Sequence, residues 1–386
     1  MRSFADNFMT IIIFLFFILT ALYVFYISSF IMGISKLKKG NNTKLFSVTI
    51  IVPARNEEKN IGNCLHSLLQ QTYPKENCSI IVVDDESTDN TAAIVEKNSQ
   101  EFSNIQLIRI HNRPQNISPK IYAVQTAIQH CNSEIIFTTD ADCVANPNWI
   151  STSTQHFEEN VGVVTGTTIF SNKNKISPLL FGIQFIEFIS QTACGAGAIG
   201  LRKVNNCNGS NMAFRKKAYE EVDGYNSIAH LNSGDDSLLA QLILQKTQWK
   251  IRFALEPEAQ VTTNPVETWK HFFQQRMRWA SQTTEYEPLT VFFLSSIFFL
   301  YVMLCIFSIV AFWYPTLFVP IIFSLCAKFF IDFFILKKFT HRTNTQYIMK
   351  YFIPAAIIHI PSILISVLGG FIGTFEWKGR KLQRTT

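Results

Sequence analysis

Long apolar runs stand at the two ends of the chain, and a stretch of mixed polarity lies between them. Residues 8–34 carry no charge, and a helix of that length crosses the roughly 30 Å hydrocarbon layer of a membrane. A cleaved signal peptide would have a shorter apolar core and a small-residue cleavage site, so a retained anchor is the favoured interpretation. Two more spans are predicted at 289–313 and 315–336, whereas 351–375 is interrupted by prolines and glycines and is not expected to cross fully.

This pattern divides the chain into four parts. They are an N-terminal anchor (1–35), a domain with polar turns (45–285), C-terminal membrane segments (288–376) and a basic tail (377–386). Lysine and arginine residues follow the first and third spans directly, and basic loops stay on the cytoplasmic side of a membrane. We therefore expect an integral protein of the inner or plasma membrane whose central domain is cytoplasmic.

Within the central domain, apolar runs of strand length alternate with segments of helical period. Strands are expected at 47–53, 79–85, 105–110 and 134–140, with a helix after each of the first three. Continuous apolar strands that alternate with helices predict an α/β fold whose parallel sheet is covered on both faces. In such a sheet the ligand binds beyond the carboxyl ends of the strands.

Polar residues gather where three of these strands end, at 53–57, 84–85 and 140–142. Asp140 and Asp142 are one residue apart, so on an extended chain their carboxylates point to the same side and repel each other unless a cation lies between them. Hard oxygen ligands of this kind suit Mg²⁺ or Mn²⁺. An acidic turn is the alternative, because aspartate is a common turn residue.

Charge and cysteine use argue against other classes of protein. The formal net charge is +6, which the basic membrane flanks explain, and no basic stripe with interleaved aromatic residues is present. Nucleic acid is therefore not an expected partner. The 8 cysteines form no C-x-x-C pair, so neither a disulfide framework nor a structural zinc site is expected.

Five motifs follow one another along the central domain: "VPARNEE", "VVDDESTD", "TDADC", "SGDDSLL" and "QQRMRW". Through them the segment 47–285 resembles the family 2 glycosyltransferases with a GT-A fold, in particular the membrane-bound branch with D, D-x-D, D and Q-x-x-R-W motifs. That branch includes ceramide glucosyltransferases and the processive synthases of cellulose, chitin and hyaluronan. The resemblance implies a Rossmann-like domain that binds a nucleotide-diphosphate sugar and a divalent cation.

The resemblance also assigns roles to individual residues. It places Asp85 at the nucleotide base, Asp142 on the metal, and Asp140 at the ribose or the metal. It makes Asp236 the catalytic base, with Asp235 as the alternative, because the family commonly has glutamate where this chain has Asp235. The rest of the nucleotide-sugar pocket is formed by Pro53, Ala54, Glu57, Asp84 and Lys120.

Sugar transfer with inversion requires few groups. One base takes the proton of the acceptor hydroxyl, and a cation neutralises the departing diphosphate. No protonating acid is then needed, in contrast to glycoside hydrolysis. Asp235 and Asp236 also precede an apolar helical run, so helix capping is an alternative role, and it is compatible with catalysis.

Gln275, Arg278 and Trp279 share one face of a predicted helix, because they stand at i, i+3 and i+4. The resemblance places this face at the acceptor and the diphosphate. An interfacial helix just before a span can carry arginine and tryptophan for anchoring alone, and both roles are compatible.

The small number of membrane segments favours a membrane lipid as the acceptor, with a UDP-sugar as the expected donor. A processive synthase of the chitin, hyaluronan or poly-N-acetylglucosamine type is the alternative. The apolar stretch 178–202 is either an interfacial segment over which a lipid approaches or a buried core helix. A receptor or transporter is not favoured, because no motif carboxylate is missing; Lys328 and Asp332, one turn apart on the third span, are expected to pair.

The C-terminal tail contains "EWKGR" (376–380), whose Trp377 and Arg380 resemble the Trp-Gly-Thr-Arg loop near the nucleotide in hyaluronan and chitin-type synthases. The alternative is a basic tail that lies on anionic headgroups. Both interpretations require a cytoplasmic tail, whereas a single crossing by 351–375 would leave it outside. We therefore expect 351–375 to bend and re-enter.

Overall fold

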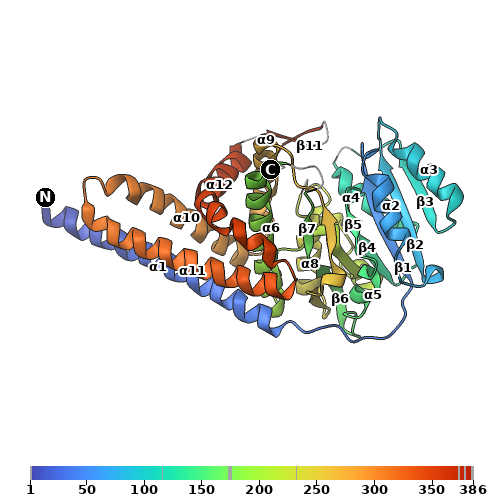
Figure 1. Ribbon diagram of the computed structural model, residues 1–386, viewed down its shortest axis with the longest axis horizontal. Coiled ribbons are helices and arrows are strands. Elements are labelled where there is room, and N and C mark those ends of the chain that lie inside the picture. Colours follow the sequence, from blue (N-terminus) through green and yellow to red (C-terminus); the bar gives the residue numbers. More distant parts are fainter. Residues whose placement is uncertain are drawn as a thin grey trace.

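The computed structural model (Figure 1) describes residues 2–114, 116–172, 176–231, 233–372, 374–377 and 380–383, with the side chains of 2–6, 8 and 372–383 left aside. A sheet domain lies at one end of the molecule, and long helices project from it to one side. The predicted order of anchor, α/β domain and C-terminal helices is thus observed.

Seven strands form the central sheet, in the order β3-β2-β1-β4-β8-β6-β9. Strands β3, β2, β1 and β4 are parallel, whereas β8 is antiparallel to both of its neighbours. Strands β6 and β9 run in the same direction as β4, so the prediction of a parallel sheet is wrong for β8 alone. The chain reaches β8 at the carboxyl end of β4, where Met212 pairs with Thr138, so β8 has to run back along β4. The strands are β1 (Val48–Ala54), β2 (Cys78–Asp85), β3 (Ile105–Ile110), β4 (Ile135–Thr138), β6 (Val161–Gly166), β8 (Met212–Arg215) and β9 (Lys250–Ala254).

Short amphipathic helices cover this sheet. In α2 the buried residues Ile61, Cys64, Leu65 and Leu68 follow the spacing of one helical face. A smaller three-stranded sheet has the order β5-β10-β7. These elements are α2 (Ile61–Leu69), α3 (Thr91–Glu101), α4 (Pro119–Gln129), α5 (Trp149–Thr154), α7 (Lys216–Glu221), α8 (Asp235–Lys246), β5 (Val144–Ala145), β7 (Thr168–Phe170) and β10 (Val261–Thr263).

Three long helices form the projecting bundle: α1 (Arg2–Lys36), α10 (Pro288–Val310) and α11 (Phe318–Arg342). Within the described part of the chain, five helical segments are long and apolar enough to cross a membrane, namely 9–36, 178–200, 288–310, 315–342 and 346–371. Large apolar side chains of the bundle such as Phe14, Phe299 and Phe330 are exposed, as lipid-facing residues would be. These features indicate a membrane protein.

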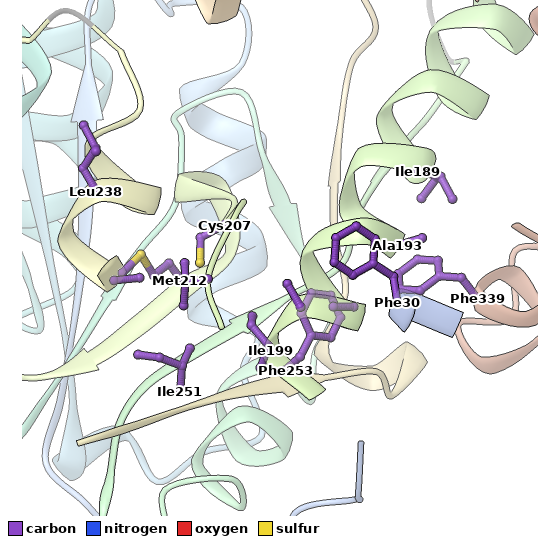
Figure 2. Packing of buried hydrophobic residues seen from close by; sticks show 14 of the residues in the cluster. Phe30, Ile189, Ala193, Ile199, Cys207, Met212, Leu238, Ile251, Phe253 and Phe339 are labelled. Atoms are coloured by element: carbon purple, nitrogen blue, oxygen red, sulfur yellow. The ribbon is translucent and has the colours of Figure 1, made fainter. Parts of the chain in front are cut away.

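Helix α6 (Pro178–Gly200) is the most deeply buried of the five. In its most apolar stretch 72% of the residues are buried inside the protein, compared with 22% to 33% in the other four. Helices α6 and α1 cross at glycines, and small residues let helix backbones approach closely. The approach is so close that a Cβ added to Gly33 would lie only 1.9 Å from the carbonyl oxygen of Gly197. Figure 2 shows Phe30 of α1 and Phe339 of α11 next to Ala193 of α6. The stretch 178–202 is thus an internal helix that joins the bundle to the domain.

Helix α12 (Phe352–Ile372) follows a segment that contacts the domain, and its end lies against the domain. Nine residues before the helix begins, the carbonyl oxygen of Thr343 accepts from the side-chain amide of Gln260 over 2.5 Å. At its other end Gly369 and Gly370 lie against Met277 of α9 (Trp269–Ala280). The short strands β11 (Thr374–Trp377) and β12 (Arg380–Gln383) follow and pair as a hairpin, with β11 next to α9.

Candidate active site

Strand register brings the sequence motifs together at one edge of the sheet. Ala54 at the end of β1 pairs with Asp84 of β2, and Ile51 of β1 pairs with Thr138 of β4. Asp140, two residues beyond Thr138, therefore reaches the level of Pro53. The chain crosses from one side of β1 to the other between β2 and β4, and this switch in strand order is where ligands bind in such sheets.

Of the two neighbouring aspartates at the end of β2, only Asp85 lines the central cavity. Both carboxylates are buried, and Asp84 is not part of the cavity lining. Pro53 and Ala54 line the cavity, whereas Glu57 is buried outside its lining and its backbone N–H donates to Thr91 over 2.7 Å. Of the five residues predicted here, Asp85, Pro53 and Ala54 thus lie at the cavity wall, and Asp84 and Glu57 do not.

Asp140 and Asp142 lie close enough to share one cation. Their carboxylate oxygens and the Sγ atom of Cys143 are within 4.8 Å of one another. Burial and the two carboxylates raise the pKa of the Cys143 thiol well above its usual value. The two carboxylates are hard oxygen donors, which fit Mg²⁺ or Mn²⁺.

Lys120, at the start of α4, lies between the D-x-D turn and the predicted base. Its ammonium is 3.1 Å from Asp140. A Cβ added to Gly209 would be 3.0 Å from Asp236 Oδ2 and 3.1 Å from Lys120 Nζ, so a larger residue at this position would press on both charged groups. Burial alone lowers the pKa of Lys120, but Asp140, Asp235 and Asp236 together raise it above its usual value. The lysine therefore stays charged.

Asp235 and Asp236 begin α8, directly after Gly234 with its positive φ of 75°. Asp236 accepts the backbone N–H of Gly209 and that of Ser237. The cap position is Gly234 and no side chain makes a capping hydrogen bond there, so the capping alternative is not observed. Burial first, and then the charge of Asp235, raise the pKa of Asp236 from 3.8 to about 6, against the opposing effect of Lys120. A carboxylate with a pKa near neutrality is suited to general-base work.

Gln275, Arg278 and Trp279 of α9 all line the cavity, as their common helical face predicts. Arg278 donates to the hydroxyl of Ser233 over 3.2 Å, which connects this helix to the loop before α8. Trp279 lies against Phe188 of α6, with ring centres 6.1 Å apart.

One cavity of about 930 Å³ connects these groups with the helix bundle. At the sheet end it is lined by Asp85, Asp140, Asp142, Asp235 and Asp236. From there it continues between α6, α10 and α12, where most of its wall is apolar.

Sequence reasoning missed several residues of this cavity. Arg276 and Glu187 form a buried ion pair next to Trp279. Tyr286 also lines the cavity, and burial and the nearby Asp236 raise its pKa. Asn208 precedes Gly209, and its amide nitrogen is buried without a hydrogen-bond partner in the described residues. Nothing in the sequence joined Glu187 to Arg276, because they lie on separate helices far apart in the chain.

The side chains of Trp377 and Arg380 lie outside the described residues. Their backbones pair with each other in the β11–β12 hairpin. A role for them at the diphosphate stays a prediction.

Residues 49–223 match the family model described as Glycosyl transferase family 2. This match confirms the resemblance to the family 2 glycosyltransferases that the motifs of this segment indicated.

Two curated relatives show the same relationship. Over 248 residues the chain is 29% identical to "Probable glycosyltransferase YdaM" of Bacillus subtilis, a match that covers 62% of this chain and 56% of that protein. Over 276 residues it is 27% identical to the poly-beta-1,6-N-acetyl-D-glucosamine synthase of Staphylococcus epidermidis, covering 69% and 61%. The chain thus spans less than two thirds of the length of these relatives.

Among solved structures, the chain is similar to the mannosyltransferase PcManGT from Pyrobaculum calidifontis, which was solved in complex with GDP-Man and Mn²⁺. The TM-score is 0.55 at 19% identity, and the match covers 90% of this chain and 99% of that one. At this identity the likeness shows the fold, which is GT-A-like, as predicted.

Proposed function

We propose that the protein is an inverting glycosyltransferase that moves a sugar from a nucleotide-diphosphate sugar to a hydroxyl of a membrane lipid at the cytoplasmic face. The observation that carries this proposal is the single cavity that has five aspartates at one end and apolar membrane helices along the rest. A polar donor and an apolar acceptor can meet in it without leaving the protein.

On the donor side, Asp85 with Pro53 and Ala54 would contact the nucleoside, at the ends of β1 and β2. Asp140 and Asp142 would hold a divalent cation, whose chemistry is to neutralise the diphosphate as it leaves. Lys120 adds a fixed positive charge 3.1 Å from Asp140. Arg278 contributes a second cation at the opposite wall.

On the acceptor side, Asp236 would take the proton of the lipid hydroxyl. The hydroxyl oxygen then forms the new bond to the anomeric carbon, while the bond from that carbon to the diphosphate oxygen breaks and the diphosphate leaves with the electron pair. Attack from the face opposite the leaving group inverts the anomeric centre. Asp236 holds the proton afterwards, which its pKa of about 6 permits.

A second candidate is a processive synthase, and one observation favours it. The chain is 27% identical to a poly-beta-1,6-N-acetyl-D-glucosamine synthase over 69% of its length. In that case the growing chain, rather than a lipid, would occupy the cavity.

The two candidates differ in their product. Purified protein in nanodiscs is incubated with radiolabelled nucleotide sugars and a membrane lipid extract, and the products are separated by organic extraction and by size. We expect label in a small lipid-soluble product that the Asp236→Asn variant does not form. Long water-soluble polymer made by the purified protein would reject the lipid acceptor and favour the synthase.

A further inference from the structure

We propose that the cavity ends in a second polar site, which binds an uncharged oxygen group of the acceptor lipid far from the hydroxyl that receives the sugar. We name it the inner polar cluster; it consists of Tyr23, Tyr301, Lys328, Asp332 and His359, all of which line the cavity. The inference rests on the proposed function, because it places the acceptor in this cavity.

The inner polar cluster lies at the end of the cavity within the bundle. On α10 the lining residues run from Thr290 to Tyr301, and no described residue of 302–310 takes part. At 1.5 Å per residue this is about 16 Å of helix. Among the described residues, lining on α11 starts only at Lys328 and on α1 only at Tyr23. The cavity therefore stops where these polar groups meet.

Contacts within the cluster join four helices. Tyr23 of α1 donates its hydroxyl to Asp332 Oδ1 over 2.5 Å, and Lys328 of α11 donates to Asp332 Oδ2 over 2.6 Å. Tyr301 of α10 lies 3.3 Å from His359 Nδ1 of α12. The predicted pairing of Lys328 with Asp332 is confirmed, and the structure adds three partners from other helices.

The charges of the cluster decide what it can bind. Lys328 and Asp332 compensate each other, so an additional buried anion or cation would leave a net charge inside the membrane bundle, which is costly. A hydroxyl or carbonyl oxygen adds no charge. It can accept from the ammonium of Lys328, which has three N–H donors.

A second observation favours an occupant that carries oxygen over a plain hydrocarbon. His359, Ser362 and Ser366 line the cavity from one face of α12, at i, i+3 and i+7. The hydroxyl of Ser366 is buried and has no hydrogen-bond partner in the described part of the chain. Buried polar groups are normally paired, so an oxygen of the occupant would satisfy it.

The contrasting explanation is that the cluster only holds the helices together. A comparable contact between the same helices, but outside the cavity, allows the binding role and the structural role to be distinguished. Thr20 of α1 and Ser324 of α11 share a buried hydrogen bond of 2.7 Å between the same two helices, and neither residue lines the cavity. The double variant Thr20→Val/Ser324→Ala therefore removes an interhelical contact without changing the cavity.

The experiment uses primary alkanols of increasing chain length and the matching terminal diols as acceptors for the full-length protein in nanodiscs. With the wild type, we expect the diol whose length spans the cavity to have a KM about fivefold to tenfold below that of its alkanol, as one buried hydrogen bond would give. Binding of the same radiolabelled diol and alkanol without donor is measured as a readout independent of turnover.

In the double variant Lys328→Met/Asp332→Leu, which leaves no lone buried charge, the diol should lose this advantage while transfer to the alkanol continues. Tyr301→Phe is a smaller change and should reduce the preference for the diol in part. If the double variant does not fold, this variant tests the inner polar cluster instead. The Thr20→Val/Ser324→Ala control should keep the full preference.

Wild-type protein that glycosylates alkanols without preferring any diol would overturn the inner site and leave the proposed function standing. Equal loss of preference in the Thr20→Val/Ser324→Ala control would also overturn it, in favour of a structural role. No transfer to any alcohol, with polymer formed instead, would overturn the proposed function and this inference together.

Discussion

Arg276 of α9 and Glu187 of α6 form an ion pair of 3.0 Å in which the side chains are 3% and 5% exposed. The guanidinium lies 4.3 Å from the ring centre of Trp279 and also donates to Gln275. The internal helix α6 and the Q-x-x-R-W helix are thus connected directly at the cavity wall.

Removal of one partner of this pair should be worse than removal of both. Arg276→Met leaves the Glu187 carboxylate buried and unpaired, at a cost of about 3 to 5 kcal/mol. The double variant Arg276→Met/Glu187→Leu should recover much of that stability. Midpoints of thermal unfolding in detergent test this order, and equal midpoints for the single and double variants would show that the pair contributes no coupling.

Asp142→Asn should reduce sugar transfer by about 100-fold or more while the protein stays folded, because it removes one of the two charged ligands for the cation. Wild-type activity should likewise be lost in excess EDTA and return on addition of Mn²⁺ or Mg²⁺. Asp223→Asn, in a loop after α7 and outside the cavity lining, is the control for handling and should retain activity. Full activity of Asp142→Asn, or of the wild type in EDTA, contradicts the metal assignment.

Asp236→Asn should bind the nucleotide sugar normally and lose turnover by about 10²-fold to 10⁴-fold, the usual contribution of a general base. Donor affinity is measured by calorimetry and turnover with labelled donor. The same measurements on Asp235→Asn should show a smaller loss in turnover, because this variant still has the Asp236 carboxylate that contacts Gly209. The reverse order would assign the base to Asp235.

The rate should fall on the acidic side with a midpoint near pH 6. Only the deprotonated carboxylate of Asp236 accepts a proton, and its pKa is raised to about 6, so activity is present above that pH and is lost as the pH falls through it. Since the charge of Lys120 lowers this pKa, Lys120→Met should move the midpoint to higher pH. A pH profile of kcat that is flat between pH 5 and 7 would be inconsistent with this role.

The C-terminal tail should lie on the same side of the membrane as the catalytic domain. Although 346–371 is long and apolar enough to cross, the segment before α12 is bonded to the domain at Thr343 and the end of α12 lies against Met277 of α9. A cysteine added at the C-terminus of a variant without reactive cysteines should resist an impermeant maleimide in intact cells and react after lysis. Labelling from outside would refute both the re-entrant path and any role of Trp377 and Arg380 at the diphosphate.

The sequence alone indicated the class of protein and most of the charged residues at the sheet end of the cavity. Order and spacing of the motifs identified the domain, and strand-length apolar runs placed Asp85, Asp140 and Asp142 at the same edge of the sheet. These conclusions depend on local periodicity and on motifs of a few consecutive residues. Such patterns lie within a single strand or helix, so they can be recognised without knowledge of long-range contacts. The pairing of Lys328 with Asp332 was predictable for the same reason, since one helical turn separates them.

Only the tertiary structure decided the rest. The direction of β8 depends on where the chain returns to the sheet after α6, and the internal position of α6 depends on the close approach of Gly33 to Gly197. Apolar periodicity looks the same whether lipid or protein covers a helix. The partners Glu187 and Arg276, and Tyr23 and Asp332, come from distant segments, and packing of whole helices brings them together. Long-range packing of this kind leaves no pattern in a single sequence, so the cavity and its inner polar cluster could be found only in the folded protein.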